Sequence, residues 1–67
     1  MELTIWYERE QKQETILFSG KTIAELLFFL KINPEIVLVV RNNEVLTPDE
    51  KVQSKDRLEL LSVVSGG

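Results

Sequence analysis

The 67-residue sequence contains no cysteine and no histidine. Without cysteine, the chain has no disulfide, no thiolate metal site and no cysteine nucleophile. Without histidine, it lacks the commonest metal ligand and the general base that works near neutral pH. These two absences leave little equipment for catalysis, and we expect neither an enzyme nor a metal site.

Positive charge and long apolar runs are also scarce. Eight Lys and Arg residues stand against eleven Asp and Glu residues, so the formal net charge is -3. Nucleic-acid partners normally demand a basic face, and a membrane span needs about 20 consecutive apolar residues. Residues 1–5 show none of the basic and apolar regions of a signal peptide. We therefore expect a cytoplasmic protein with no nucleic-acid and no membrane partner.

The first nineteen residues predict a β-hairpin. Leu3, Ile5 and Tyr7 alternate with Thr4 and Trp6, which is the period of a half-buried strand. Residues 8–14, "EREQKQE", are all polar and predict a solvated hairpin loop. Residues 15–19, "TILFS", then predict a second strand.

The period changes after residue 19 and predicts a helix. Thr22 and Glu25 form a capping-box pattern, in which each side chain satisfies a free backbone N–H at the start of a helix. An apolar stripe with the spacing i, i+3, i+4, i+7 follows, and it consists of Ile23, Leu26, Leu27 and Leu30. The helix must end before Pro34, so we expect about three turns. Phe28 and Phe29 fall off the stripe and either cover the helix flanks or make an exposed contact.

Three more strands are expected in the remainder of the chain. Residues 35–42, "EIVLVVRN", are apolar on both faces, which is typical of a central strand. Asn42 and Asn43 suit a tight turn into the short strand "EVL". Residues 57–64, "RLELLSVV", predict the last strand.

This order of elements predicts an α+β domain with the ubiquitin-like β-grasp fold. Two strands, one helix and three strands would form a mixed five-stranded sheet packed on one helix. The first and last strands would lie side by side and parallel, since the intervening helix allows that connection. With 67 residues the chain is one domain at most. We expect residues 1–63 to form this domain and residues 64–67 to form a flexible tail.

The sequence resembles the ubiquitin-like sulfur carriers of the ThiS/MoaD type. The resemblance covers essentially the whole chain and rests on the element order, "TIAELL", Asn42-Asn43, "KDRLEL" and the terminal "VVSGG". Glycine makes up about 7% of residues on average, so a Gly-Gly end arises by chance in roughly one chain in two hundred. The Gly-Gly end alone is weak evidence for this family, but together with the predicted element order it becomes strong evidence. The short length and the "VVSGG" ending look more like ThiS than MoaD.

The resemblance implies a carrier that works through its C-terminal carboxylate. An ATP-dependent enzyme of the ubiquitin-activating type would adenylate Gly67, and a sulfur donor would convert it into a thiocarboxylate. The carrier itself would bind no cofactor, because the partner uses the ATP. Gly66 and Gly67 have no Cβ to clash in a narrow channel. The further partners implied are a sulfurtransferase or a thiazole synthase of thiamine biosynthesis.

Three alternatives stay open. The carrier could donate sulfur to the pterin of the molybdenum cofactor, with the large subunit of a pterin synthase as its partner. It could be a protein modifier conjugated through Gly67 to lysines of its targets. It could also be a β-grasp interaction module whose tail is incidental.

A second predicted site lies on the sheet face away from the helix. The strand parities place Leu3, Ile5, Ile36, Leu38 and Val40 toward the helix. The opposite face would then carry an apolar partner-binding patch made of Trp6, Leu17, Val37, Val39, Leu61 and Val63. Contiguous exposed apolar surface marks interaction sites, and Trp is enriched among residues that dominate interface energies.

Overall fold

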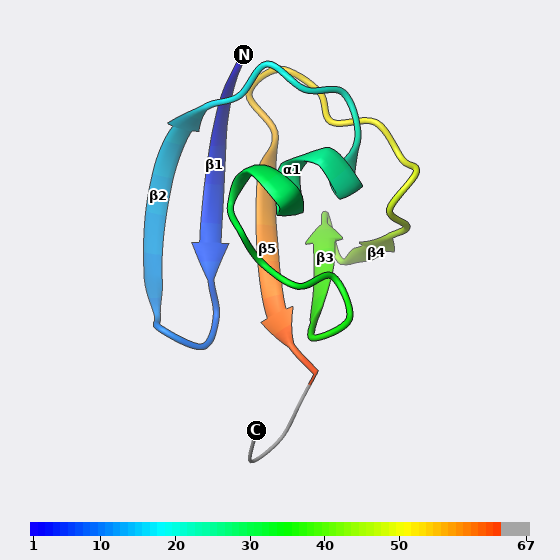
Figure 1. The fold of residues 1–67 in the computed structure, drawn as a ribbon. Helices are drawn as coiled ribbons and strands as arrows, with labels where there is room; N and C mark the ends of the chain where they lie inside the picture. Colours follow the sequence, from blue (N-terminus) through cyan, green and yellow to red (C-terminus); the bar gives the residue numbers. More distant parts are fainter. Residues whose placement is uncertain (64–67) are drawn as a thin grey trace.

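The computed structural model describes residues 1–63 of the chain. The elements are β1 (Glu2–Tyr7), β2 (Lys12–Leu17), α1 (Ile23–Phe29), β3 (Val37–Arg41), β4 (Glu44–Leu46) and β5 (Arg57–Ser62). Figure 1 shows α1 lying across one face of the sheet, with the start of β1 and the end of β5 at opposite ends of the sheet. None of the described helices is long and apolar enough to cross a membrane.

The five strands form one mixed sheet in the order β2-β1-β5-β3-β4. The pair of β1 and β5 is parallel, and all other neighbours are antiparallel. A parallel pair needs a long crossover between its strands, and the segment that contains α1, β3 and β4 supplies it. This architecture confirms the predicted fold class, a β-grasp sheet packed on one helix.

The first hairpin has a shorter loop than expected. The turn occupies residues 8–11, and Lys12, Gln13 and Glu14 already belong to β2. The expectation of a loop over residues 8–14 was wrong because β2 is an edge strand. The side chains of these three residues are exposed, so a strand can form here without an apolar pattern while its backbone pairs with residues 5–7 of β1.

Helix α1 begins as predicted but has about two turns instead of three. The Thr22 side chain caps the helix by accepting a hydrogen bond from the Glu25 N–H at 3.3 Å. Glu25 reaches back to the N–H of Lys21 at 2.7 Å. At the other end Lys31 has a φ of 61°, and the Ile32 N–H donates to the Leu27 carbonyl. This Schellman motif ends the helix well before Pro34.

The core lies between α1 and the sheet face that the helix covers. Its buried members are Leu3, Ile5, Phe18, Ile23, Leu26, Leu27, Val39, Leu46, Val52, Leu58 and Leu60. The predicted apolar stripe of the helix therefore faces the sheet, with Leu30 packed against the rim of the core. Buried area of this kind contributes roughly 25 cal/mol per Å² of apolar surface.

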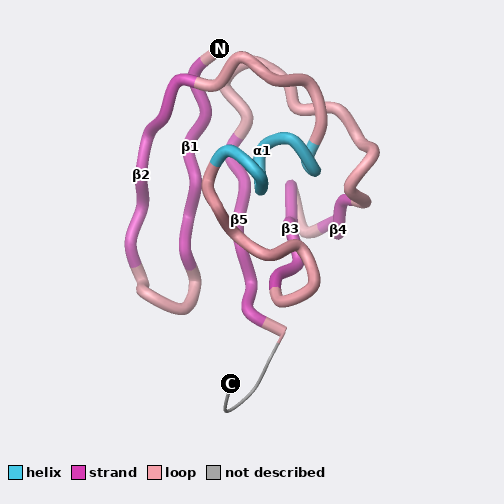
Figure 2. The backbone as a smooth tube through the Cα atoms, viewed as in Figure 1, coloured by secondary structure: helices cyan, strands magenta, loops and turns pink. Residues whose placement is uncertain are grey.

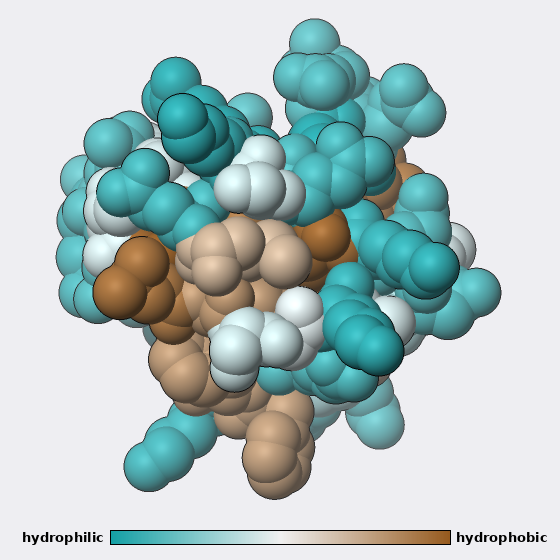
Figure 3. Space-filling model, turned by 90° about the horizontal axis from the view of Figure 1, so that it is seen from above, coloured by the Kyte–Doolittle hydropathy of each residue, from teal (hydrophilic) through white to brown (hydrophobic). Residues whose placement is uncertain are grey.

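The two phenylalanines of α1 have different surroundings. The ring of Phe29 packs edge-to-face on Phe18, with centroids 5.6 Å apart. Phe28 is 86% exposed. Viewed from above, the molecule shows apolar surface in the middle of the face and toward one edge, with hydrophilic side chains around most of it (Figure 3).

The turn between β3 and β4 agrees with the sequence. Asn42 and Asn43 have φ values of 53° and 66°, and Arg41 pairs directly with Glu44. Two successive residues with positive φ define the two-residue type I′ hairpin, which suits the twist of the strands. Figure 2 shows the long loops that connect α1 to β3 and β4 to β5.

Candidate functional site

The last strand leads directly to the predicted C-terminal site. β5 occupies the centre of the sheet, between β1 and β3, so both of its edges are paired. Just beyond it, the N–H of Val63 donates to the Ile36 carbonyl at 2.9 Å. The chain is thus held firmly up to Val63. The predicted tail, residues 64–67, lies outside the described residues, and with it the predicted sulfur-carrying Gly66 and Gly67.

Strand register decides which side chains face away from the helix. Residues directly opposite each other in neighbouring strands lie on the same face. Leu60 is buried in the core and pairs with Val39. The neighbouring pair, Leu38 and Leu61, must therefore point to the other face. The pair of Trp6 and Glu59 lies on that outer face as well.

Two predicted patch residues are on the wrong face. Val39 is only 3% exposed and belongs to the core, and Val37 packs against the core from its edge. Leu38, which was expected to face the helix, is 40% exposed on the outer face. The sequence of β3 could not reveal this, because the strand is apolar at every position from Val37 to Val40. Its facing is set by pairing with β5, where the pattern alternates.

The structure brings three apolar positions of the central strands together on the outer face. Trp6 and Leu61 are half-buried there, and Leu38 lies directly opposite Leu61. Val45 of β4 is 58% exposed, and Val63 is 48% exposed. We call these five residues the outer apolar patch. Val40, opposite Val45, shares this face but is itself buried.

Leu17 lies apart from the outer apolar patch. It is 78% exposed on the outer face, as expected, but it pairs with Glu2 at the opposite end of β1 from Trp6. Glu2 and Trp6 are four residues apart in one strand, a separation of about 13 Å.

The sequence did not predict that Leu38, Val40 and Val45 lie on the outer face. An alternative facing of β3 would have found the first two, and the alternation of the short strand "EVL" would have found Val45.

The Trp6 side chain is fixed by the turn that follows β1. Its indole N–H donates to Glu8 Oε2 at 2.7 Å, which satisfies the polar end of the ring. The Glu8 N–H in turn donates to the Leu60 carbonyl at 3.1 Å. A Trp with a satisfied N–H offers a large apolar surface at little further cost in side-chain entropy, which suits an interface anchor.

An ion pair braces the loop that leads into β5. The Arg41 guanidinium contacts Asp56 Oδ2 at 2.8 Å, and the same oxygen accepts a hydrogen bond from the Gln53 N–H at 2.8 Å. Both side chains are largely covered, at 22% and 11% exposure. The pair ties β3 to the start of β5 and so supports the strand that carries the C-terminal end.

The acidic side chains of the described residues do not form a metal-binding cluster, and Tyr7 has a shifted pKa. Within residues 1–63 no group of three or more acidic residues could hold a metal ion. The Tyr7 hydroxyl donates to Glu14 Oε1 at 2.9 Å. Burial, this hydrogen bond and the nearby charges of Glu14 and Glu10 together raise the pKa of Tyr7 to about 12. Tyr7 is thus protonated near neutral pH and cannot serve as a base there.

Comparison with known proteins defines the class to which this fold and strand arrangement belong. The chain is 39% identical over 57 residues to the sulfur carrier protein TtuB of Thermus thermophilus, which covers 85% of this chain and 88% of that protein. It is 34% identical over 58 residues to an uncharacterized protein of Archaeoglobus fulgidus, with 87% and 85% of the two chains covered. The class is that of the ubiquitin-like sulfur carriers, small carriers rather than catalysts. The sequence model of the ThiS family matches residues 5–67, and the chain belongs to that family.

Proposed function

We propose that this protein carries sulfur as a thiocarboxylate on Gly67. The observation that supports this most directly is the match to a sulfur carrier over most of both chains. The sequence ends in Gly66 and Gly67, and the family match extends to that end. The paired central strand β5 gives such an end a rigid base.

The chemistry requires an activating partner. A carboxylate is a poor electrophile, so the Gly67 carboxylate attacks the α-phosphorus of ATP and displaces pyrophosphate. Sulfide from a donor then attacks the acyl-adenylate, and AMP leaves with the former carboxylate oxygen. Apart from this carboxylate, which is the nucleophile of the first step, we expect the carrier to contribute no acid, base or nucleophile. Its contribution is to deliver a narrow end that has no Cβ at its last two positions.

The outer apolar patch is the surface by which we expect the activating enzyme to hold the carrier. Leu61 and Leu38 lie in its two middle strands, with Trp6 of β1 on one side and Val45 of β4 on the other. Val63 follows β5 at the beginning of the C-terminal end. A partner bound here would contact the carrier next to the group that it modifies. We expect Trp6 to be the anchor of this interface, because Trp is enriched among the residues that contribute most to affinity.

The expected acceptor is a thiazole synthase of thiamine biosynthesis, because the matching family is ThiS. A pterin synthase and the lysines of target proteins are the alternative acceptors of the same activated end. The three are separated by incubating the thiocarboxylate form with each acceptor. Consumption of the thiocarboxylate by only one of them identifies the pathway.

The carrier chemistry is tested by measuring the intact mass of the full chain. The chain is incubated with ATP, an activating enzyme from the same genome and a sulfide source. We expect a mass gain equal to the difference between sulfur and oxygen. A variant without Gly67 is the control and should show no gain. If the wild-type chain gains no mass with an enzyme that activates another carrier, the proposal is wrong. Adducts on other proteins would identify a modifier instead.

A further inference from the structure

A cavity of about 160 Å³ lies where β5 gives way to the C-terminal end. Its apolar walls come from Ile32, Ile36, Val37 and Leu60, and its other lining residues are Tyr7, Arg9, Glu10 and Ser62. It opens on the helix side of the sheet, because Val37 and Leu60 belong to the face that α1 covers. It is thus distinct from the outer apolar patch, which lies on the other face.

The size of the cavity limits what can occupy it. Pockets for cofactors and drug-sized ligands measure about 300–1,000 Å³, so this cavity is too small for such a molecule. A cavity of about 150 Å³ with apolar walls accommodates a group the size of benzene. The occupant that fits is one apolar side chain.

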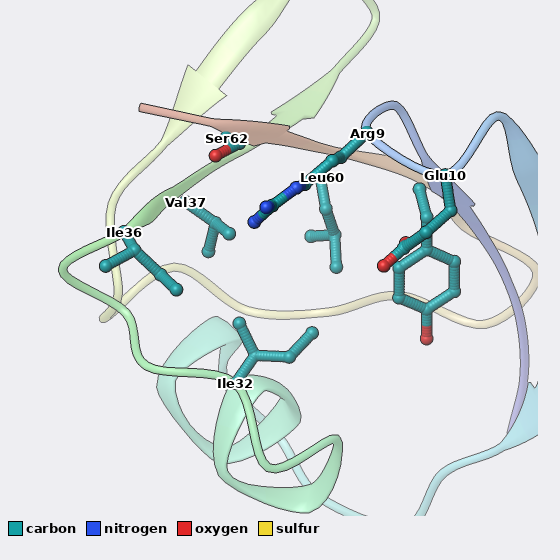
Figure 4. Close-up of a pocket in the computed structure, with 8 residues that line it drawn as sticks. Arg9, Glu10, Ile32, Ile36, Val37, Leu60 and Ser62 are labelled. Carbon is teal, nitrogen blue, oxygen red and sulfur yellow. The ribbon is translucent and has the colours of Figure 1, made fainter. Parts of the chain in front are cut away.

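Arg9 provides a positive charge at the mouth of the cavity. Figure 4 shows its side chain reaching between Val37 and Leu60, while Glu10 lies beyond Leu60 on the other side. Within residues 1–63 the Arg9 guanidinium has no hydrogen-bond or ion-pair partner. The turn that carries Arg9 is fixed, because the preceding Glu8 N–H donates to the Leu60 carbonyl. A guanidinium so placed is available to a carboxylate that enters beside the apolar side chain.

The cavity is also fastened to the base of the C-terminal end. The carbonyl of Ile36, a wall residue, accepts the N–H of Val63. Ser62, another lining residue, pairs with Val37. A protein that binds Val63 from the helix side of the sheet therefore lies next to the cavity.

The position of the cavity favours a separate protein as the occupant. It lies beside the base of the C-terminal end, which the proposed function assigns to an activating enzyme. The Arg9 guanidinium offers such an enzyme a partner for a carboxylate.

We propose that this cavity receives one apolar side chain of the protein that takes up the C-terminal end, with an aspartate or glutamate next to that side chain paired to Arg9. This inference rests on the proposed function and adds a recognition feature on the helix side of the sheet. The partner then contacts the carrier on both faces of the sheet, at the outer apolar patch on one face and at the cavity on the other.

The test compares Arg9→Glu with a matched charge reversal elsewhere. Lys51→Glu is the control, because Lys51 is exposed, bridges to Thr22 at the start of α1 and does not line the cavity. Each full-length variant is titrated with the activating enzyme in a calorimeter without ATP. We expect Arg9→Glu to raise the Kd about tenfold or more, as for a charge pair at an interface, and Lys51→Glu to change it less than about twofold. Circular dichroism verifies that both variants are folded.

Methyl NMR spectra of the labelled full-length chain locate the contact. Addition of the enzyme should shift the methyl signals of Ile32, Ile36 and Val37. Wild-type affinity of Arg9→Glu, or unshifted signals of these residues, would overturn the inference. Shifts of the same signals on removal of residues 64–67 from the free chain would also overturn it, in favour of the chain's own end. The mass measurement on the wild-type chain is independent of these readouts, so failure of the carrier function is seen separately.

Discussion

Exchanging two adjacent residues of β3 for threonine tests which face of the sheet meets a partner. Val39 is 3% exposed in the core, whereas its neighbour Leu38 is 40% exposed on the outer face. Threonine keeps the β-branched shape of valine but has a hydroxyl in place of one methyl group. At Val39 that hydroxyl must leave water, so Val39→Thr should lower the free energy of unfolding by about 2 kcal/mol. At Leu38 the hydroxyl stays hydrated, and the loss should be less than about 1 kcal/mol.

The effects on binding should be the reverse of the effects on stability. Unfolding is measured in urea through the fluorescence of Trp6, the single tryptophan, and affinity is measured by titration with the activating enzyme. For a chain of this size, 2 kcal/mol corresponds to a decrease in Tm of roughly 8–16 °C. We expect Leu38→Thr to weaken binding and Val39→Thr to bind normally below its melting transition. If Val39→Thr unfolds like the wild type while Leu38→Thr is strongly destabilised, the assignment of the two faces is refuted.

Three further predictions concern local features of the fold. Lys31→Gly should raise the free energy of unfolding by about 0.5–1 kcal/mol in urea titrations, because Lys31 holds a φ of 61° that costs a side chain energy; an unchanged midpoint would contradict this. Gly20→Ala should lower it by about 1–3 kcal/mol, since a Cβ there would collide with the ring of buried Phe18; a stabilised variant would show that the ring can move away. The raised pKa of Tyr7 means that the contribution of Tyr7 to folding stability is fully present below pH 10 and is lost between about pH 10 and 12, where the unfolded state loses the phenolic proton first. Glu14→Gln should lower this pKa, as followed by the absorbance of tyrosinate, and an unchanged titration would rule out the Glu14 contact as a cause.

Much of the fold could be predicted because local signals agree with it. The cap at Thr22, the apolar stripe of the helix and the two asparagines of the β3–β4 turn each specify one conformation. The structure differs from the predicted elements where the sequence has no local pattern that specifies the conformation. The polar residues 12–14 form a strand only because they pair with the edge of β1. Helix α1 ends early because Lys31 has a positive φ, a conformation that a lysine in the sequence does not predict.

The outer face was predicted correctly in β1 and β5 but not in β3. Alternation in "RLELLS" separates the buried Leu58 and Leu60 from Leu61, so the sequence alone assigns its two faces. The run Val37 to Val40 contains no polar residue that could mark the solvent side. Its facing depends on the register with β5, which is a property of the sheet and not of the strand.

The central position of β5 also determines how the molecule responds to force. Because β1 and β5 are adjacent and parallel, β1 begins and β5 ends at opposite ends of the sheet (Figure 1). Tension between the ends therefore slides β5 along β1, which loads several hydrogen bonds at the same time. A hairpin pulled from its open end would lose its bonds one after another. A pull on the end of β5 against the start of β1 is thus opposed by several hydrogen bonds together, and the sheet resists it better than it would resist peeling.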